Sequence, residues 1–259
     1  MRLANGGGVR VFILVCMVVV LGGISYGSFW EFPELLPPSQ YGNILINRTS
    51  EKNGQQPVSF SHWSHRMRYT CRVCHFELDF AMKVNTTGIT EEENRQGEFC
   101  GTCHNGDTAF GHTKENCPKC HNGNIAAGAK KFEKLKSFPK ARFGNKINWT
   151  RAMRKKKINP KMTIFEEDYS PIPFKKTLKL KPEWSMANNA YAVFPHKAHS
   201  MWLDCANCHP DIFNIKKKST KHFRMEYILE GKFCGVCHLN VALPIQDCKA
   251  CHPGLKTIQ

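Results

Sequence analysis

The sequence predicts mainly short α-helices and irregular loops wrapped around covalently bound cofactors, with little or no β-sheet. Two observations predict this fold class. The pattern Cys-x-x-Cys-His occurs six times in 259 residues, and it is the attachment signature of c-type haem. In addition, glycine, proline and motif residues interrupt every run of alternating polarity that would indicate a strand. Six haems are therefore expected to form much of the apolar interior.

Each motif supplies two thiols and one imidazole to one haem. Two cysteines three residues apart fit one helical turn, so both can form thioethers while the adjacent histidine reaches the iron. The thioether residues are therefore Cys71, Cys74, Cys100, Cys103, Cys117, Cys120, Cys205, Cys208, Cys234, Cys237, Cys248 and Cys251. The proximal iron ligands are His75, His104, His121, His209, His238 and His252. Of the 13 cysteines, only Cys16 lies outside the motifs.

Zinc and disulfides explain these motifs less well. Zinc ribbons pair two Cys-x-x-Cys knuckles for each metal and do not need a histidine after every second cysteine. A disulfide framework would not repeat the same spacing six times, and a thioredoxin-like motif normally occurs once.

The first thirty residues predict export. Arg2 and Arg10 precede an uncharged run from Val11 to Trp30, which is long enough for a secretory signal or a membrane anchor. We interpret residues 1–30 as one of these and favour the anchor, because no strong cleavage site follows. The motifs are then expected in the periplasm, at the inner membrane. Haem is attached to thiols in that compartment, so the two signals support each other.

The motifs fall into two similar units. Unit 1 covers residues 58–123 and unit 2 covers residues 191–259, and Phe60-Ser-His-Trp-Ser-His65 matches Phe194-Pro-His-Lys-Ala-His199 at an offset of 134 positions. Residues 31–57 are predicted to be a Pro-rich spacer and residues 124–190 a basic linker. A weaker match between residues 41–44 and 143–146 suggests a similar lead-in to each unit.

The formal charge of +16 is concentrated in the linker. Residues 130–181 hold 17 Lys and Arg against 4 Asp and Glu, with a short helix expected over residues 151–157 that ends before Pro160. We interpret this segment as a solvated linker, or as a docking face for an acidic redox partner or anionic lipid headgroups. Export argues against nucleic acid as a partner. A quinol dehydrogenase and an outer-membrane conduit are candidate redox partners in the periplasm or at the inner membrane.

Six histidines lie outside the motifs, one for each iron. They are His62, His65, His112, His196, His199 and His222, and their number predicts a histidine on the distal face of every haem. His112 has no counterpart in unit 2, and Met82 is the alternative distal ligand at the third site of unit 1. We favour His112, because a methionine seven residues past a motif histidine usually serves packing.

The arrangement F-x-H-x-x-H, followed by three motifs with F-C-G-x-C-H at the second, resembles the tri-haem c7-type members of the class III cytochromes c. Residues 60–121 and 194–252 carry this resemblance. It implies a multihaem cytochrome in which the following residues share an iron: His62 and His75, His65 and His104, His196 and His209, His199 and His238, and His222 and His252. It also implies a low-potential periplasmic electron carrier of anaerobic metal-respiring or sulfate-respiring bacteria.

Histidine on both faces of an iron leaves no position for a substrate, so such haems can only pass electrons. The expected function is electron transfer by a hexahaem c-type cytochrome that is not an enzyme. The alternative is a membrane-anchored quinol dehydrogenase or a periplasmic haem reductase. Either would need an open or labile axial position, and the third site of unit 1 is where the sequence permits one.

Overall fold

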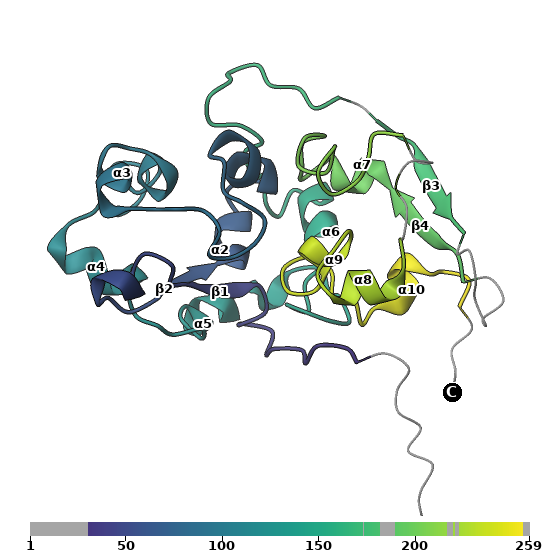
Figure 1. The fold of residues 1–259 in the computed structure, drawn as a ribbon, viewed down its shortest axis with the longest axis horizontal. Helices are drawn as coiled ribbons and strands as arrows, with labels where there is room; N and C mark the ends of the chain where they lie inside the picture. The colour runs from purple at the N-terminus through teal and green to yellow at the C-terminus, as the bar shows by residue number, and fades with distance from the viewer. Residues whose placement is uncertain (1–30, 173, 182–189, 217–219, 221–222, 256–259) are drawn as a thin grey trace, which may run out of the picture. The chain divides into compact units, whose positions relative to one another are not determined.

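The computed structural model describes residues 31–172, 174–181, 190–216, 220 and 223–255 (Figure 1). The helices in these ranges are short, and the six-residue α6 (Trp149–Arg154) is the longest α-helix. None of them is long and apolar enough to cross a bilayer. The predicted signal or anchor, residues 1–30, lies outside the described residues. The other α-helices are α2 (His62–Arg66), α3 (Glu91–Arg95), α4 (Cys117–Cys120), α5 (Ala129–Phe132), α7 (His196–His199), α8 (Met225–Leu229), α9 (Gly235–His238) and α10 (Cys248–Cys251).

Two antiparallel pairs of four-residue strands accompany these helices. β1 (Asn43–Ile46) pairs with β2 (Val58–Ser61), and β3 (Thr177–Leu180) pairs with β4 (Ala192–Pro195) (Figure 1). Short helices, loops and these two small sheets confirm the predicted fold class.

The two hairpins are equivalent. In the first, Ile44 lies opposite Phe60, and in the second, Leu178 lies opposite Phe194. Each second strand leads directly into a helix that begins at the first histidine of F-x-H-x-x-H. The strand before unit 2 is therefore 177–180, and the suggested lead-in at 143–146 is wrong. β1 also lies within residues 31–57, so part of the predicted spacer belongs to the fold of unit 1.

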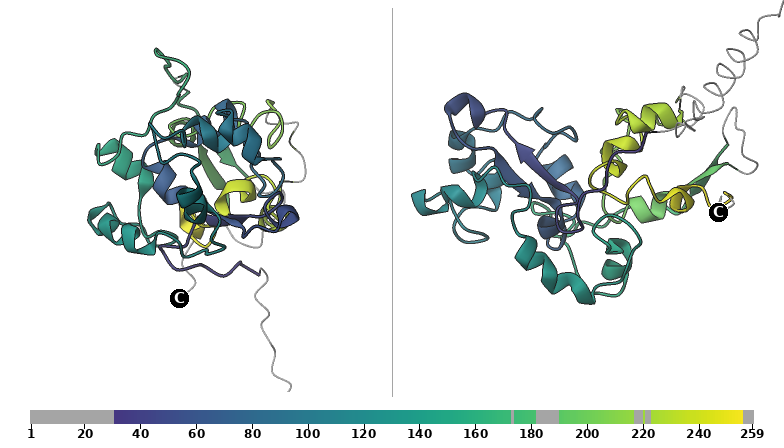
Figure 2. Two further views of the ribbon diagram at one scale, coloured as in Figure 1. Left: turned by 90° about the vertical axis from the view of Figure 1, so that its left-hand side faces the viewer. Right: turned by 90° about the horizontal axis from the view of Figure 1, so that it is seen from below.

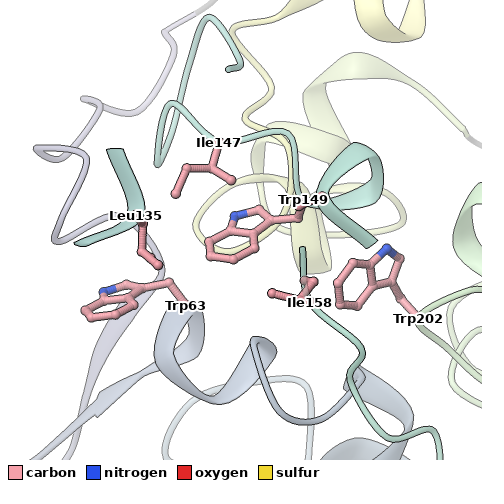
Figure 3. Close-up of a cluster of buried hydrophobic side chains, with 7 residues drawn as sticks. Trp63, Leu135, Ile147, Trp149, Ile158 and Trp202 are labelled. Atoms are coloured by element: carbon pink, nitrogen blue, oxygen red, sulfur yellow. The ribbon is translucent and has the colours of Figure 1, made fainter. Parts of the chain in front are cut away.

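A hydrophobic core lies between the two units and is built largely from the basic middle segment (Figure 3). Trp63 comes from α2 and Trp202 follows α7, while the middle segment supplies the other members, Leu135, Ile147, Trp149, Ala152 and Ile158. Figure 2 shows this teal segment beside both the blue first unit and the green and yellow second unit. The first part of the predicted linker therefore packs against both units, and it adds a protein core to the one expected from the haems.

Local hydrogen bonds explain how a segment so rich in lysine folds. Asn148 caps α6 by accepting from the N–H of Arg151 at 2.9 Å, a common helix start. The indole N–H of Trp149 donates to Asn145 at 3.1 Å, so this buried ring leaves no polar group unpaired. The charged residues point outward while one face of the segment is buried. The helix expected over 151–157 is present, but it begins and ends a few residues earlier.

Candidate haem sites

Each motif forms a tight helical turn. In five of the six motifs, the histidine N–H donates to the carbonyl of the first cysteine at 2.7 to 2.9 Å. In the first motif, Val73–Glu77 forms a π-helical turn. Such a turn places both thiols on one side, next to the histidine. All twelve motif cysteines are free thiols, so the chemistry and the geometry both fit thioether attachment.

Ten of the eleven described histidines are oriented by a backbone carbonyl. Their Nδ1 atoms lie 2.6 to 3.0 Å from these oxygens. A hydrogen bond at Nδ1 fixes the ring and leaves Nε2 to bind a metal. The ten are the six motif histidines with His62, His65, His196 and His199. No such bond is found for His112 in the described part of the chain.

The carbonyl acceptors repeat between the units. The backbone carbonyl of Gly42 bonds to Nδ1 of His62. The carbonyl of Lys176, 134 positions further along the chain, bonds to Nδ1 of His196. Gln56 accepts from His121 at 3.0 Å, and its counterpart Ala190 accepts from His252 at 2.9 Å. The third motif slips by three residues in the sequence, yet its histidine keeps the same backbone partner.

Three of the predicted histidine pairs face one another across a gap of metal size. The ring centroids are 6.5 Å apart for His62 and His75, 6.3 Å for His65 and His104, and 6.1 Å for His199 and His238. A metal–nitrogen bond is about 2.0 Å long and the ring centre lies about 1.1 Å beyond the nitrogen, so two imidazoles on one ion have centroids about 6 Å apart. These residues therefore fit one iron between each pair.

In each unit, one phenylalanine ring is in direct contact with two histidine rings. Phe60 stacks on His65 at 4.3 Å and meets His62 edge-on at 4.8 Å. Phe194 does the same with His199 at 4.2 Å and His196 at 4.8 Å. These centroid distances, 4.2 to 4.8 Å, are shorter than the 6.1 to 6.5 Å between the paired histidine rings. Rings next to the histidine pairs are thus in direct contact, whereas the paired histidines leave a gap. The F-x-H-x-x-H pattern thus supplies one ring that orients two candidate ligand histidines.

The remaining predicted pairs stay predictions. Among the described residues, no ring contact joins His196 to His209, although both have the carbonyl bonds of ligand histidines. His222, the predicted partner of His252, lies outside the described residues. The structure therefore brings together three of the five pairs that the resemblance implies.

The two candidates for the third site of unit 1 lie in different surroundings. The carbonyl of His112 accepts from Arg95 at 3.0 Å, and burial, His104 and Arg95 all lower the pKa of His112. It therefore lies near the second site. Met82 belongs to a loop whose Asn85 accepts from the N–H of Asn47, just after β1, at 2.9 Å.

Burial favours the neutral form of the candidate ligand imidazoles. It lowers the pKa of His62 to about 3, and it is also the main cause of the lowered pKa values of His65, His75, His199 and His238. Neutral imidazole is the form that binds iron. The same burial, with help from neighbouring thiols, raises the pKa of Cys74, Cys234 and Cys237 to about 12.

A glycine in the second motif of each unit allows a helix to pack against the haem turn. A Cβ atom on Gly101 would lie 1.8 Å from the carbonyl oxygen of Asn94 in α3. On Gly235 it would lie 1.9 Å from the carbonyl oxygen of Ile228 in α8. The glycine of F-C-G-x-C-H is therefore required by the close approach of two backbones, a signal that was visible in the repeat.

Thiols of neighbouring motifs lie near enough to raise one another's pKa. Within unit 1, the Cys100 thiol raises the pKa of Cys74, and the Cys120 thiol raises the pKa of Cys100. Across the boundary between the units, the Cys71 thiol raises the pKa of Cys237. Within unit 2, Cys234 is influenced by both Cys208 and Cys251.

Sequence reasoning missed a buried arginine that joins the units. Arg72, inside the first motif, is 2% exposed and pairs with Glu77, with Asp204 at 3.2 Å and with Glu166 at 3.4 Å. Its guanidinium also lies 3.9 Å from the centre of the Tyr169 ring. No local pattern links residues so far apart in the chain, so only the folded structure reveals this cluster.

Comparison with known proteins gives one family match. The family described as "Cytochrome c7 and related cytochrome c" matches residues 58–122 and 192–253. Among solved structures, the C-terminal hexaheme fragment of GSU1996 is 26% identical, with 84% of this chain and 99% of that chain covered and a TM-score of 0.28. The dodecaheme cytochrome c GSU1996 is 24% identical, with 83% and 75% covered and a TM-score of 0.27. No match is found among curated proteins.

Proposed function

Because both units of the chain belong to the family of cytochrome c7 and related cytochromes c, we propose that the protein is a periplasmic, low-potential hexahaem cytochrome that carries electrons through bis-His haems. The spacing of the three imidazole pairs carries this proposal. When bound, each haem supplies a one-electron ferric–ferrous couple. The paired histidines would bind the iron from both sides and so exclude substrate.

The order in which thiols of neighbouring motifs influence one another supports conduction through all six sites. Unit 1 is linked from its third site through its second to its first, and the first is linked to the second site of unit 2. Closely spaced haems exchange electrons fast, because tunnelling falls steeply with distance. The units therefore act in series and not as two independent carriers.

The mass of the mature protein, with its electron paramagnetic resonance spectrum, tests this proposal. Mass reports the number of covalent haems and any cleavage of residues 1–30 together, and we expect six haems. The spectrum should show low-spin ferric iron throughout. Any count other than six, or a spectrum dominated by five-coordinate iron, would contradict the proposal.

At the third site of unit 1, the distal ligand is His112 or Met82. The count of spare histidines favours His112. Position favours Met82, because its loop is tied to residues just after β1, and His121 forms a bridge with Val58, which lies opposite Ile46 in the hairpin. His112→Ala and Met82→Ala decide between them, since only one should remove low-spin character from a single haem. Methionine ligation would also give this haem a higher potential than its bis-His neighbours.

A reductase or a quinol dehydrogenase is the second candidate. It is favoured by the third site of unit 1, where no histidine pair is found among the described residues. Carbon monoxide binds ferrous haem only where an axial position is open or its ligand is weakly held. Binding at one of the six reduced haems would support an enzyme, whereas no binding would support the carrier.

The basic middle segment is proposed as the docking face for an acidic redox partner. Its exposed cations include Lys134, Lys136 and the run Arg154 to Lys157, with Glu133 as the one acidic residue between residues 130 and 157. A quinol dehydrogenase or an outer-membrane conduit would fit this role, with residues 1–30 holding the protein at the inner membrane. Electron exchange with such a partner should slow as ionic strength rises.

A further inference from the structure

Arg66 places a positive charge on the boundary between the two units. It is the last residue of α2, and its Nη2 donates to the carbonyl oxygen of Val241 at 3.0 Å. Val241 belongs to the turn after the second motif of unit 2, where its N–H donates to the carbonyl of Cys237 at 3.2 Å. The guanidinium lies 5.4 Å from the centre of the Trp149 ring. A side chain of unit 1 is thus held against a haem site of unit 2.

Arg66 lies beside candidate ligands of two different sites. It follows His62, the proposed distal ligand at the first site of unit 1, by one turn of α2. Its hydrogen-bond partner Val241 lies three residues after His238, the proposed proximal ligand at the second site of unit 2. The guanidinium is therefore near both sites.

No carboxylate of the described residues forms an ion pair with Arg66. Arg72, six positions further on, has three such partners. A partly buried cation without a carboxylate partner is costly unless a nearby group gains from its charge. A haem iron changes its charge by one unit, and its energy therefore depends on a neighbouring fixed charge.

We propose that Arg66 sets the reduction potentials at the boundary, raising them at the first site of unit 1 and the second site of unit 2. Ferrous iron carries one positive charge fewer than ferric iron, so a nearby cation favours the reduced form. An electron that crosses the boundary oxidises one of these irons from ferrous to ferric and reduces the other from ferric to ferrous. No proton or atom is transferred. This inference rests on the proposed electron-carrier function.

The test is a redox titration followed by nuclear magnetic resonance, in which each ferric haem gives its own shifted methyl signals. In Arg66→Met and Arg66→Gln, the reduced-to-oxidised ratio of two haems at a fixed potential should fall tenfold, which corresponds to about 59 mV. The other four haems should change less. Arg66→Lys keeps the positive charge, so its six haems should have the wild-type potentials. Lys52→Met removes one charge from the exposed turn Glu51–Asn53 and should change none of the six.

The two neutral variants separate charge from structure. Glutamine keeps an N–H donor for the Val241 carbonyl and methionine does not, so equal shifts in both identify the charge as the cause. Unchanged potentials in either folded variant, an equal shift of all six haems, or a shift in Arg66→Lys as large as that in Arg66→Met would overturn the proposal. A haem count other than six, or high-spin iron in the wild type, would instead refute the electron-carrier function.

Discussion

Replacing Arg72 with methionine should loosen the joint between the two units. The guanidinium is 2% exposed, and its partner Glu77 is 4% exposed. Methionine fills a similar volume but leaves the Glu77 carboxylate buried with only the N–H of Ile164, at 2.9 Å, as a hydrogen-bond donor. The predicted effect is therefore the cost of an unpaired buried charge and not that of a cavity.

The magnitude follows from the exposure of each partner. Removing one member of a buried ion pair costs about 3–5 kcal/mol. The Glu166 carboxylate is 57% exposed, so this pair adds about 0–1 kcal/mol. We expect Arg72→Met to lower the free energy of unfolding by about 4 kcal/mol. A second change, Glu77→Gln, removes the stranded charge and should recover part of this loss.

Guanidinium chloride unfolding, followed by tryptophan fluorescence and haem absorption, measures the effect. Arg95→Met is the matched control, because Arg95 pairs with Glu91 at 2.7 Å on the surface, where the two side chains are 53% and 74% exposed. It should cost less than about 0.5 kcal/mol. If Arg72→Met costs no more than this control, or if Glu77→Gln makes the double variant still less stable, the assignment of a buried ion-pair joint is incorrect.

Two further predictions concern the haem turns and their ligands. Gly101→Ala and Gly235→Ala should each lower the free energy of unfolding by about 1–3 kcal/mol, because the added Cβ overlaps with a helix backbone. Gly88→Ala is the control, since nothing lies within 4 Å of its added Cβ, and it should leave the thermal unfolding unchanged. Burial lowers the pKa of His62 from its ordinary value of 6.5, and a bond from Nε2 to iron would hold the same neutral form, so the unfolded chain binds more protons below this pH. The free energy of unfolding, measured in urea, should therefore fall as the pH decreases below 6.5, and a flat profile there would contradict a neutral His62 in the folded protein.

The sequence predicts the parts of the candidate sites that repeat. The motif spacing predicts a proximal histidine for each site, and F-x-H-x-x-H predicts three histidines whose rings face His75, His104 and His238 in the structure. These patterns can be read from the sequence because the chemistry of haem attachment dictates spacing over a few residues. The third site of unit 1 lacks such a pattern, which is why His112 and Met82 both remained candidates.

The hairpins and the core could not be predicted in the same way. The four residues of β3 alternate between polar and apolar side chains, but they follow a stretch with two prolines and pair across a connection that returns only at Ala192. Leu135, Ile147 and Trp149 are separated by lysines, so composition indicated a solvated linker. Their burial depends on Trp63 and Trp202 from the two units, and a contact between distant segments leaves no local periodicity to read.

The residues that join the units differ from those that hold the haems, because they do not repeat. At the offset of 134 positions, Arg66 corresponds to Ser200 and Arg72 to Ala206. The joint also uses Asn207, which donates to the carbonyl of His75 at 2.9 Å, and its counterpart in unit 1 is Val73. Unit 2 therefore offers no second copy of this surface to another unit. The contacts that bind cofactors are common to both units, whereas the contacts between units fix a single order in which unit 1 supplies the cations.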